Sequence, residues 1–178
     1  MIEAPVSTPP QAYMDIVRPL IDKAREFLEA GQQLQAFAFV GSLTSHQIIP
    51  VTIQPGSGED KDKSAREIKA AALVLEADFV FAIMEAWSLR PDKMPQMDTI
   101  LDKYGSIGAS PYAVDVCSFS LETRRGVWVA QAPIKPKGIS KKKRTIGKVE
   151  FRYYTEVQGR FTHLLPVKED DEPPTILH

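Results

Sequence analysis

The chain has 178 residues, with 22 Lys and Arg against 23 Asp and Glu, which gives a formal net charge of -1. A nearly neutral molecule has no long-range attraction for nucleic acid, anionic membranes or acidic substrates, so any electrostatic preference must be local. The length suits one domain that buries its own core, and the single cysteine, Cys117, excludes an intrachain disulfide and favours a reducing compartment.

The N-terminal segment, 1–11, is rich in proline and is expected to be flexible. It carries Glu3 and Pro5 where a secretion signal needs basic residues followed by an unbroken apolar stretch. The most apolar region, 70–84, is interrupted by acidic residues and is shorter than the ~20 residues of a membrane-spanning helix. These features predict a cytoplasmic protein with no membrane partner.

Two segments have the apolar spacing of amphipathic helices. The first covers about 12–30, and Pro19 inside it predicts either a kink or a later start of the helix. The second covers about 62–77, where Leu73 and Val74 widen the apolar stripe and suggest that most of the helix surface is buried.

Three segments around the second helix are typical of β-strands. Segments 35–41 and 48–54 form a predicted hairpin, and Pro50 places the second strand at a sheet edge or a bulge because proline cannot donate to a ladder. Residues 79–87 alternate with largely apolar side chains on both faces, which indicates a central strand.

Prolines and glycines in segment 90–111 predict a loop with one short helical turn near 97–103. A second hairpin is expected from 112–121 and 127–132. An even-length turn between these strands gives one apolar face shared by both. The residues on that face are Cys117, Phe119, Leu121, Trp128, Ala130 and Ala132.

The last predicted hairpin joins 148–157 to 160–167 through Gln158-Gly159, where glycine supplies the positive φ of a tight turn. With this turn Tyr153 would face Leu164 and Tyr154 would face His163. The segment that follows, 168–178, is acidic and proline-rich and is expected to be a flexible tail.

The order of the predicted elements indicates the fold class. Only the segment around the second helix is long enough for a parallel crossover, so most strands must pair with antiparallel neighbours. We therefore expect a single α+β domain over 12–167: one mostly antiparallel (mixed) sheet of about seven strands with two main helices covering one face.

A basic segment, 135–148, has the sequence KPKGISKKKRTIGK and no acidic residue. Such charge density neutralises phosphates by counterion release, which predicts polyanion binding that depends strongly on salt. The segment has no aromatic residue to stack on a base, and the alternative is a solvated, mobile loop tethered by the acidic tail of its own chain. Its basic residues are Lys135, Lys137, Lys141, Lys142, Lys143, Arg144 and Lys148.

Two carboxylates, Glu85 and Asp115, stand between apolar neighbours on predicted strands. Burial would raise the pKa of such a carboxyl group and suit it to general acid or base catalysis, with His46 or His163 completing the set. The alternative is that Glu85 lies near a strand end beside Arg90 or a lysine, and that Asp115 faces water.

No metal or cofactor site is predicted. The three histidines are far apart and no Cys-x-x-Cys or His-x-His pair occurs. The turn 54–58 precedes a Lys-Ser pair, as a phosphate-binding loop would, but Ser57 and Asp62 stand where that loop needs glycine. Cys117 has no identifiable neighbouring base and is expected to pack as a small apolar residue.

No motif names a family, and whether the protein is an enzyme stays open. The leading hypothesis is an accessory or interaction domain that binds nucleic acid or an acidic protein surface through 135–148, or a partner through the strand edge near Pro50. The rival is a small enzyme or ligand-binding domain with a pocket floored by Glu85, Trp87 and Asp115. A homo-oligomer, in which an edge strand pairs across a two-fold axis, is the third possibility.

Overall fold

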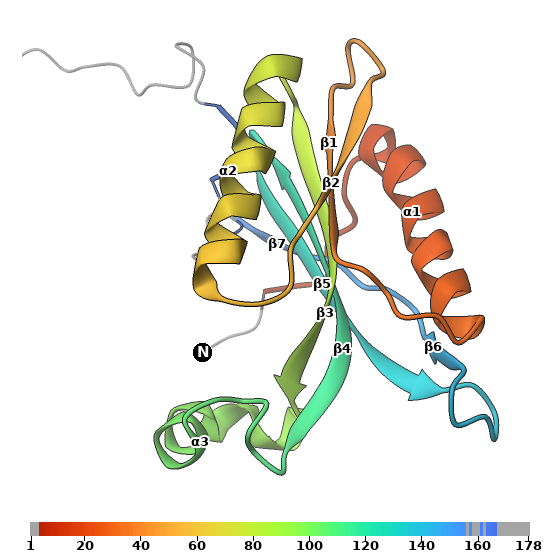
Figure 1. Cartoon of the computed structure of the whole chain (residues 1–178), viewed down its shortest axis with the longest axis vertical. Coiled ribbons are helices and arrows are strands. Elements are labelled where there is room, and N and C mark those ends of the chain that lie inside the picture. Colours follow the sequence, from red (N-terminus) through yellow and green to blue (C-terminus); the bar gives the residue numbers. More distant parts are fainter. Residues whose placement is uncertain (1–3, 156, 158–160, 162, 167–178) are drawn as a thin grey trace, which may run out of the picture.

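The structure is a computed structural model that describes residues 4–155, 157, 161 and 163–166. The predicted tail, 168–178, lies outside these residues. Figure 1 shows a curled sheet seen nearly along its plane, with a helix on either side. The elements are α1 (Gln11–Glu29), β1 (Phe37–Gly41), β2 (Ile48–Thr52), α2 (Gly58–Leu75), β3 (Phe79–Leu89), η1 (Pro91–Gln96), α3 (Met97–Tyr104), β4 (Ala113–Thr123), β5 (Gly126–Pro136), β6 (Arg144–Ile146) and β7 (Arg152–Tyr154).

The seven strands form one sheet in the order β2-β1-β3-β4-β5-β6, with β7 paired to β5. Every pairing between these strands is antiparallel, and the sheet curls into a half-barrel. The α+β class and the single sheet of about seven strands are therefore confirmed. The segment predicted as a loop with one helical turn contains η1 and the eight-residue helix α3, which brings the number of α-helices in the described part of the chain to three.

Helix α1 follows Pro10 and runs through Pro19 without a break, so the predicted later start is wrong. The Pro10 carbonyl accepts the Met14 N–H at 3.1 Å, which begins the helical hydrogen bonding upstream of Pro19. The buried side chains recur every three or four residues, as an amphipathic helix requires. They are Met14, Val17, Ile21, Ala24 and Leu28.

Helix α2 begins at Gly58, four residues before its predicted start, because a capping box precedes it. The Ser57 hydroxyl accepts the Asp60 N–H and the Asp60 carboxylate accepts the Ser57 N–H, which satisfies two backbone donors at the helix start. The expected burial of Leu73 and Val74 is wrong, since they are 67% and 83% exposed. Only one narrow stripe of this helix packs on the sheet.

The two long helices lie on opposite faces of the sheet, and in this the structure differs from the expected arrangement on one face (Figure 1). Phe79, Phe81 and Ile83 of β3 pack in the same cluster as α1. The intervening Val80 and Ala82 pack in the cluster of α2. A central strand with apolar side chains on both faces needs a cover on each, which explains the arrangement.

The predicted edge position of β2 is confirmed, because it ends the strand order. Pro50 stands opposite Phe39 in the β1–β2 pair. The N–H groups of Ile53 and, by alternation, of Val51 and Ile49 point to β1, so the N–H that Pro50 lacks would have pointed to the open edge. This proline therefore weakens the open edge as a template for another strand.

The register of the β4–β5 hairpin is confirmed: Cys117 pairs with Ala132, Phe119 with Ala130, and Leu121 with Trp128. The turn is shorter than predicted, because pairing continues to Thr123 and Gly126. These pairs put their apolar side chains in the core beneath α1.

The predicted C-terminal hairpin is wrong in the part that the structure describes. Strand β7 pairs with β5, so Tyr153 stands opposite Trp128 and their rings lie 4.7 Å apart. The described residues among 160–167 belong to no strand, and Gln158-Gly159 lies outside the described residues. Pairing with β5 lets Tyr153 cover Trp128.

Candidate functional site

The lower half of the sheet in Figure 1 extends beyond α1 and α2. Residues Phe79–Ile83 of β3 are all buried, whereas Met84–Ser88 alternate between half-buried and exposed. Strand β4 pairs with β5 only from Val116 onward, so the strands separate below that point and β5 continues to β6 (Figure 1). The residues predicted to act on a ligand fall mainly in this uncovered half.

The basic segment forms the tip of the β5–β6 hairpin and is ordered. Lys135 pairs with Thr145 and Pro136 with Arg144. The turn is closed by the Lys137 N–H, which donates to the Lys143 carbonyl at 2.8 Å. Within the turn the Ser140 hydroxyl accepts the Lys143 N–H at 3.0 Å, so the turn has internal hydrogen bonds.

The end of α1 anchors this hairpin. The Glu29 carboxylate accepts the Thr145 hydroxyl at 2.8 Å and pairs with the Lys137 ammonium at 3.2 Å. These hydrogen bonds, with that from Thr145 first, lower the pKa of Glu29. Arg25 donates to the carbonyls of Ile146 and Gly147, both at 3.2 Å. The hairpin therefore keeps a fixed position relative to the helix.

Three of the predicted polyanion-binding residues are already engaged with acids. Lys137 pairs with Glu29, Arg144 with Glu85, and Lys148 with Glu150 at 3.4 Å. The other four side chains are exposed and form no ion pair with the described part of the chain. These free lysines are Lys135, Lys141, Lys142 and Lys143.

Glu85 lies on the same face of β3 as Phe79, Phe81 and Ile83, which α1 covers. Arg144 of β6 reaches Glu85 because the sheet is curled. The guanidinium binds both carboxylate oxygens, at 2.8 Å and 3.4 Å. The alternative placed Glu85 near a strand end beside Arg90 or a lysine. Instead Glu85 lies within β3 and its basic partner is Arg144. The guanidinium therefore occupies both oxygens of the carboxylate that was expected to act as acid or base.

Cys117 stands opposite Glu85 on β4 and is buried. Burial, with a smaller contribution from the Glu85 carboxylate, raises the pKa of the Cys117 thiol to about 12. A buried thiol that holds its proton this tightly is a poor nucleophile. Its predicted role as a small apolar core residue agrees with this position.

Trp87 and Asp115 stand opposite each other on the same face, next to Glu85. The structure thus brings together the three residues of the proposed pocket floor. Trp87 is 62% exposed and packs against Gly108, where an added Cβ would come within 2.4 Å of the indole. Asp115 is exposed, so it faces water. These residues form an open surface around the ion pair between Glu85 and Arg144.

His46 and His163, the histidines that the structure describes, lie elsewhere. His46 is exposed in the β1–β2 connection, beside the end of β3 that begins at Phe79, about 20 Å along the strand from Glu85. His163 interacts with Glu122, near the same upper end. Neither histidine completes an acid-base set with Glu85 or Asp115. Among the described residues, no group of three or more His, Cys, Asp or Glu could hold a metal ion.

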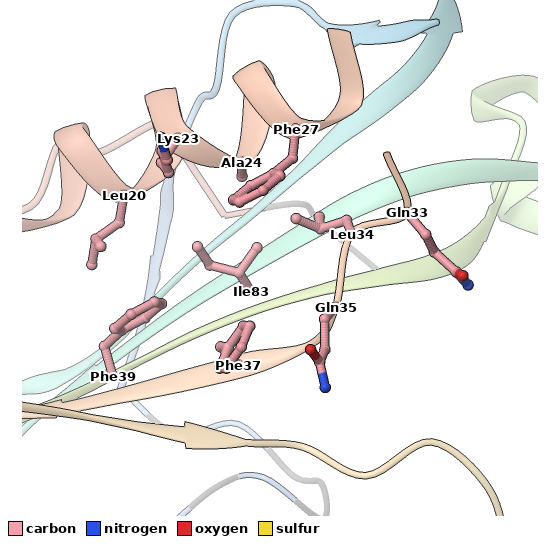
Figure 2. Close-up of a pocket in the computed structure, with 10 residues that line it drawn as sticks. All are labelled: Leu20, Lys23, Ala24, Phe27, Gln33, Leu34, Gln35, Phe37, Phe39 and Ile83. Carbon is pink, nitrogen blue, oxygen red and sulfur yellow. The ribbon is translucent and has the colours of Figure 1, made fainter. Parts of the chain in front are cut away.

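A cavity of about 330 Å³ lies between α1 and the β1 side of the sheet (Figure 2). Three separate stretches of the sequence, 20–27, 33–39 and 83, line the cavity, so no local sequence pattern marked it. The only available signal was the group of phenylalanines at the end of α1 and along β1. The lining residues are Leu20, Lys23, Ala24, Phe27, Gln33, Leu34, Gln35, Phe37, Phe39 and Ile83.

Comparison of the chain with protein-family models, with curated proteins and with solved structures gives no match. Inferences about function therefore rest on these residues. Among the described helices, none combines the length and apolar character needed to cross a lipid bilayer. Two features of the described residues are candidate ligand-binding sites: the β5–β6 hairpin, with its free lysines, and the cavity beside α1.

Proposed function

We propose that this protein is a non-catalytic binding domain that holds the phosphate backbone of a nucleic acid on its β5–β6 hairpin. The observation that supports this proposal is the set of free lysines on an ordered hairpin. Lys135 lies on β5, while Lys141, Lys142 and Lys143 follow one another in the turn. These four lysines therefore lie on one hairpin, while the chain as a whole is nearly neutral.

Counterion release is the physical basis of this binding. Each lysine that neutralises a phosphate of duplex DNA lowers the slope of log K against log salt by about 0.9, so four contacts give a slope of about -3.6. Between 50 mM and 200 mM salt the affinity should fall roughly 10²-fold. Segment 135–148 has no aromatic residue that could stack on a base, which favours the backbone of a duplex over unpaired bases.

The rival enzymatic proposal has less support. Its central carboxylate, Glu85, is engaged by Arg144, and its neighbour Cys117 is buried with a raised pKa. Asp115 and Trp87 are exposed rather than enclosed. Catalysis by carboxylates of this kind depends on a site that excludes water, which an open surface does not offer.

The test is a charge-neutralised hairpin, Lys141→Gln with Lys142→Gln and Lys143→Gln. Arg144 stays unchanged, since removing it would leave Glu85 without its partner. The matched control is Lys63→Gln with Arg66→Gln and Lys69→Gln on the exposed side of α2, which changes the net charge by the same amount. Binding to a fluorescein-labelled duplex is followed by anisotropy at several salt concentrations.

We expect the hairpin variant to lose most of its affinity at low salt, and its salt slope to become shallower by about 2.7. The α2 control should keep the wild-type affinity and slope. Equal loss in both variants would mean that net charge alone matters and would overturn the proposal. Binding of poly-glutamate without binding of the duplex would overturn it in favour of an acidic protein partner.

A further inference from the structure

We propose that the cavity between α1 and the β1 side of the sheet binds a small amphipathic anion, an aliphatic or aromatic carboxylate. Its apolar body would lie among the phenylalanines and its carboxylate would lie at Lys23. The site is separate from the β5–β6 hairpin, because none of the free lysines lines it. The proposal therefore does not depend on nucleic-acid binding.

The walls of the cavity come from regular elements. On α1, Leu20, Ala24 and Phe27 are four and three residues apart and so face the same direction. On β1, Phe37 and Phe39 share a face, and Ile83 stands opposite Phe37 on β3. Figure 2 shows these side chains turned toward a common space, with Leu34 of the α1–β1 connection at one end.

The cavity stays open because α1 is fixed on its other side. Arg25 and Glu29 bind β6 and its flanking residues, and this holds the end of the helix toward the hairpin. Phe27 remains 41% exposed, although it is a large apolar side chain facing the sheet.

The size and lining of the cavity suit a small molecule. Its volume of about 330 Å³ falls within the range of small-molecule pockets, roughly 300–1,000 Å³. Covering the exposed parts of Phe27, Phe37 and Phe39 would gain about 25 cal/mol for each Å² of apolar surface removed from water. An apolar ligand therefore has a clear source of affinity here.

Charge complementarity selects an anion. Lys23 is the only charged residue among those that line the cavity, and its ammonium lies 5.6 Å from the centre of the Phe27 ring. Its present partner is Glu26 at 3.3 Å, and both side chains are well exposed. An exposed pair of this kind is weak, so a ligand carboxylate can compete for the ammonium. In Figure 2 the side-chain amides of Gln33 and Gln35 point away from the apolar side chains of the cavity.

The experiment uses decanoate and decanol as probes, titrated into the full chain by isothermal titration calorimetry. Lys23→Gln removes the charge at the cavity, and Arg18→Gln is its matched control, an exposed basic residue of α1 that does not line the cavity. Leu34→Trp fills the cavity from the connecting segment without altering a fully buried position. Thermal unfolding of each variant checks that it is folded.

We expect decanoate to bind with a stoichiometry of one, and Lys23→Gln to weaken it about fivefold while leaving decanol and the Arg18→Gln variant unaffected. Leu34→Trp should abolish binding of both probes. Unchanged binding to a folded Leu34→Trp protein would place the probes elsewhere and overturn the proposal. Failure of the wild type to bind either probe, or equal effects of the two charge changes, would also overturn it.

Discussion

The two halves of β3 differ in what covers them. Its first five residues, Phe79–Ile83, are buried, with α1 on one face and α2 on the other. Its following residues alternate with exposed side chains and include Glu85 and Trp87. The same strand thus serves as the core of a three-layer arrangement and, a few residues later, as part of an open surface.

This difference predicts where a substitution affects folding. In the covered half, the rings of Phe81 and Phe119 stack with 7° between their planes and 6.1 Å between their centres. In the uncovered half, an ion pair between half-exposed side chains, Glu85 and Arg144, replaces the apolar packing. We therefore expect substitutions in the covered half to affect folding strongly, and those in the uncovered half to change the surface with little effect on folding.

The largest expected effect is that of Phe81→Ala. Phe81 is fully buried, so its truncation leaves a cavity and should lower the free energy of unfolding by about 3–5 kcal/mol. The matched variant is Trp87→Ala, an aromatic truncation on the same face of the same strand. Since Trp87 is mostly exposed, its loss should cost no more than about 1 kcal/mol. Urea denaturation of both variants measures the contrast.

Equal losses of unfolding free energy in these two variants would contradict the proposed difference between the two halves of β3. A large loss for Trp87→Ala would mean that its contact with Gly108 holds the α3 region to the sheet. A small loss for Phe81→Ala would mean that the core collapses around the missing ring.

The second prediction concerns the reactivity of the Cys117 thiol, at the boundary between the two halves. A thiol whose pKa is raised from 9.0 to about 12 contains about 10³-fold less thiolate at neutral pH. In the folded protein Cys117 should therefore resist a thiol reagent such as dithionitrobenzoate at pH 8, and should react readily in urea. Reaction in the native state at the rate of a free cysteine would show that the uncovered half opens as far as β4.

The same shift makes stability depend on pH. The folded state holds the thiol proton more tightly than the unfolded chain does. The contribution of the protonated Cys117 thiol to the free energy of unfolding is therefore fully present below the pKa of the unfolded state, near 9.0. It is then lost as the pH rises toward about 12. A Cys117→Ala variant should lack this alkaline loss.

The sequence predicted the covered half better than the uncovered half, for a physical reason. Strand alternation in β3 and the facing positions in β4 and β5 fixed the register, because a slip of one residue would expose the whole apolar face. The exposure of Leu73 and Val74 on α2 was not predicted, because the apolar pattern of a helix does not show how much of its surface the sheet covers. Strands β6 and β7 have three residues each, too few for an alternation signal.

The candidate binding residues were likewise predicted only where they are contiguous in the sequence. The basic segment was visible because its residues are contiguous. The partner of Glu85 was not, because Arg144 lies 59 residues away and reaches it only through the curl of the sheet. The cavity beside α1 combines residues 20–27, 33–39 and 83, which meet only in the folded chain.

The smallest expected effect is that of the ion pair between Glu85 and Arg144. Each side chain is about one-third exposed, 32% and 31%, so water screens the pair even though its geometry is bidentate. A double-mutant cycle with Glu85→Gln and Arg144→Gln should give a coupling free energy of about 0.2–1 kcal/mol. The hairpin should stay in place in both variants, since Glu29 and Arg25 anchor it independently. A coupling above about 2 kcal/mol would mean that the pair is shielded like a core contact, and the uncovered half would then have to be regarded as a second structural core.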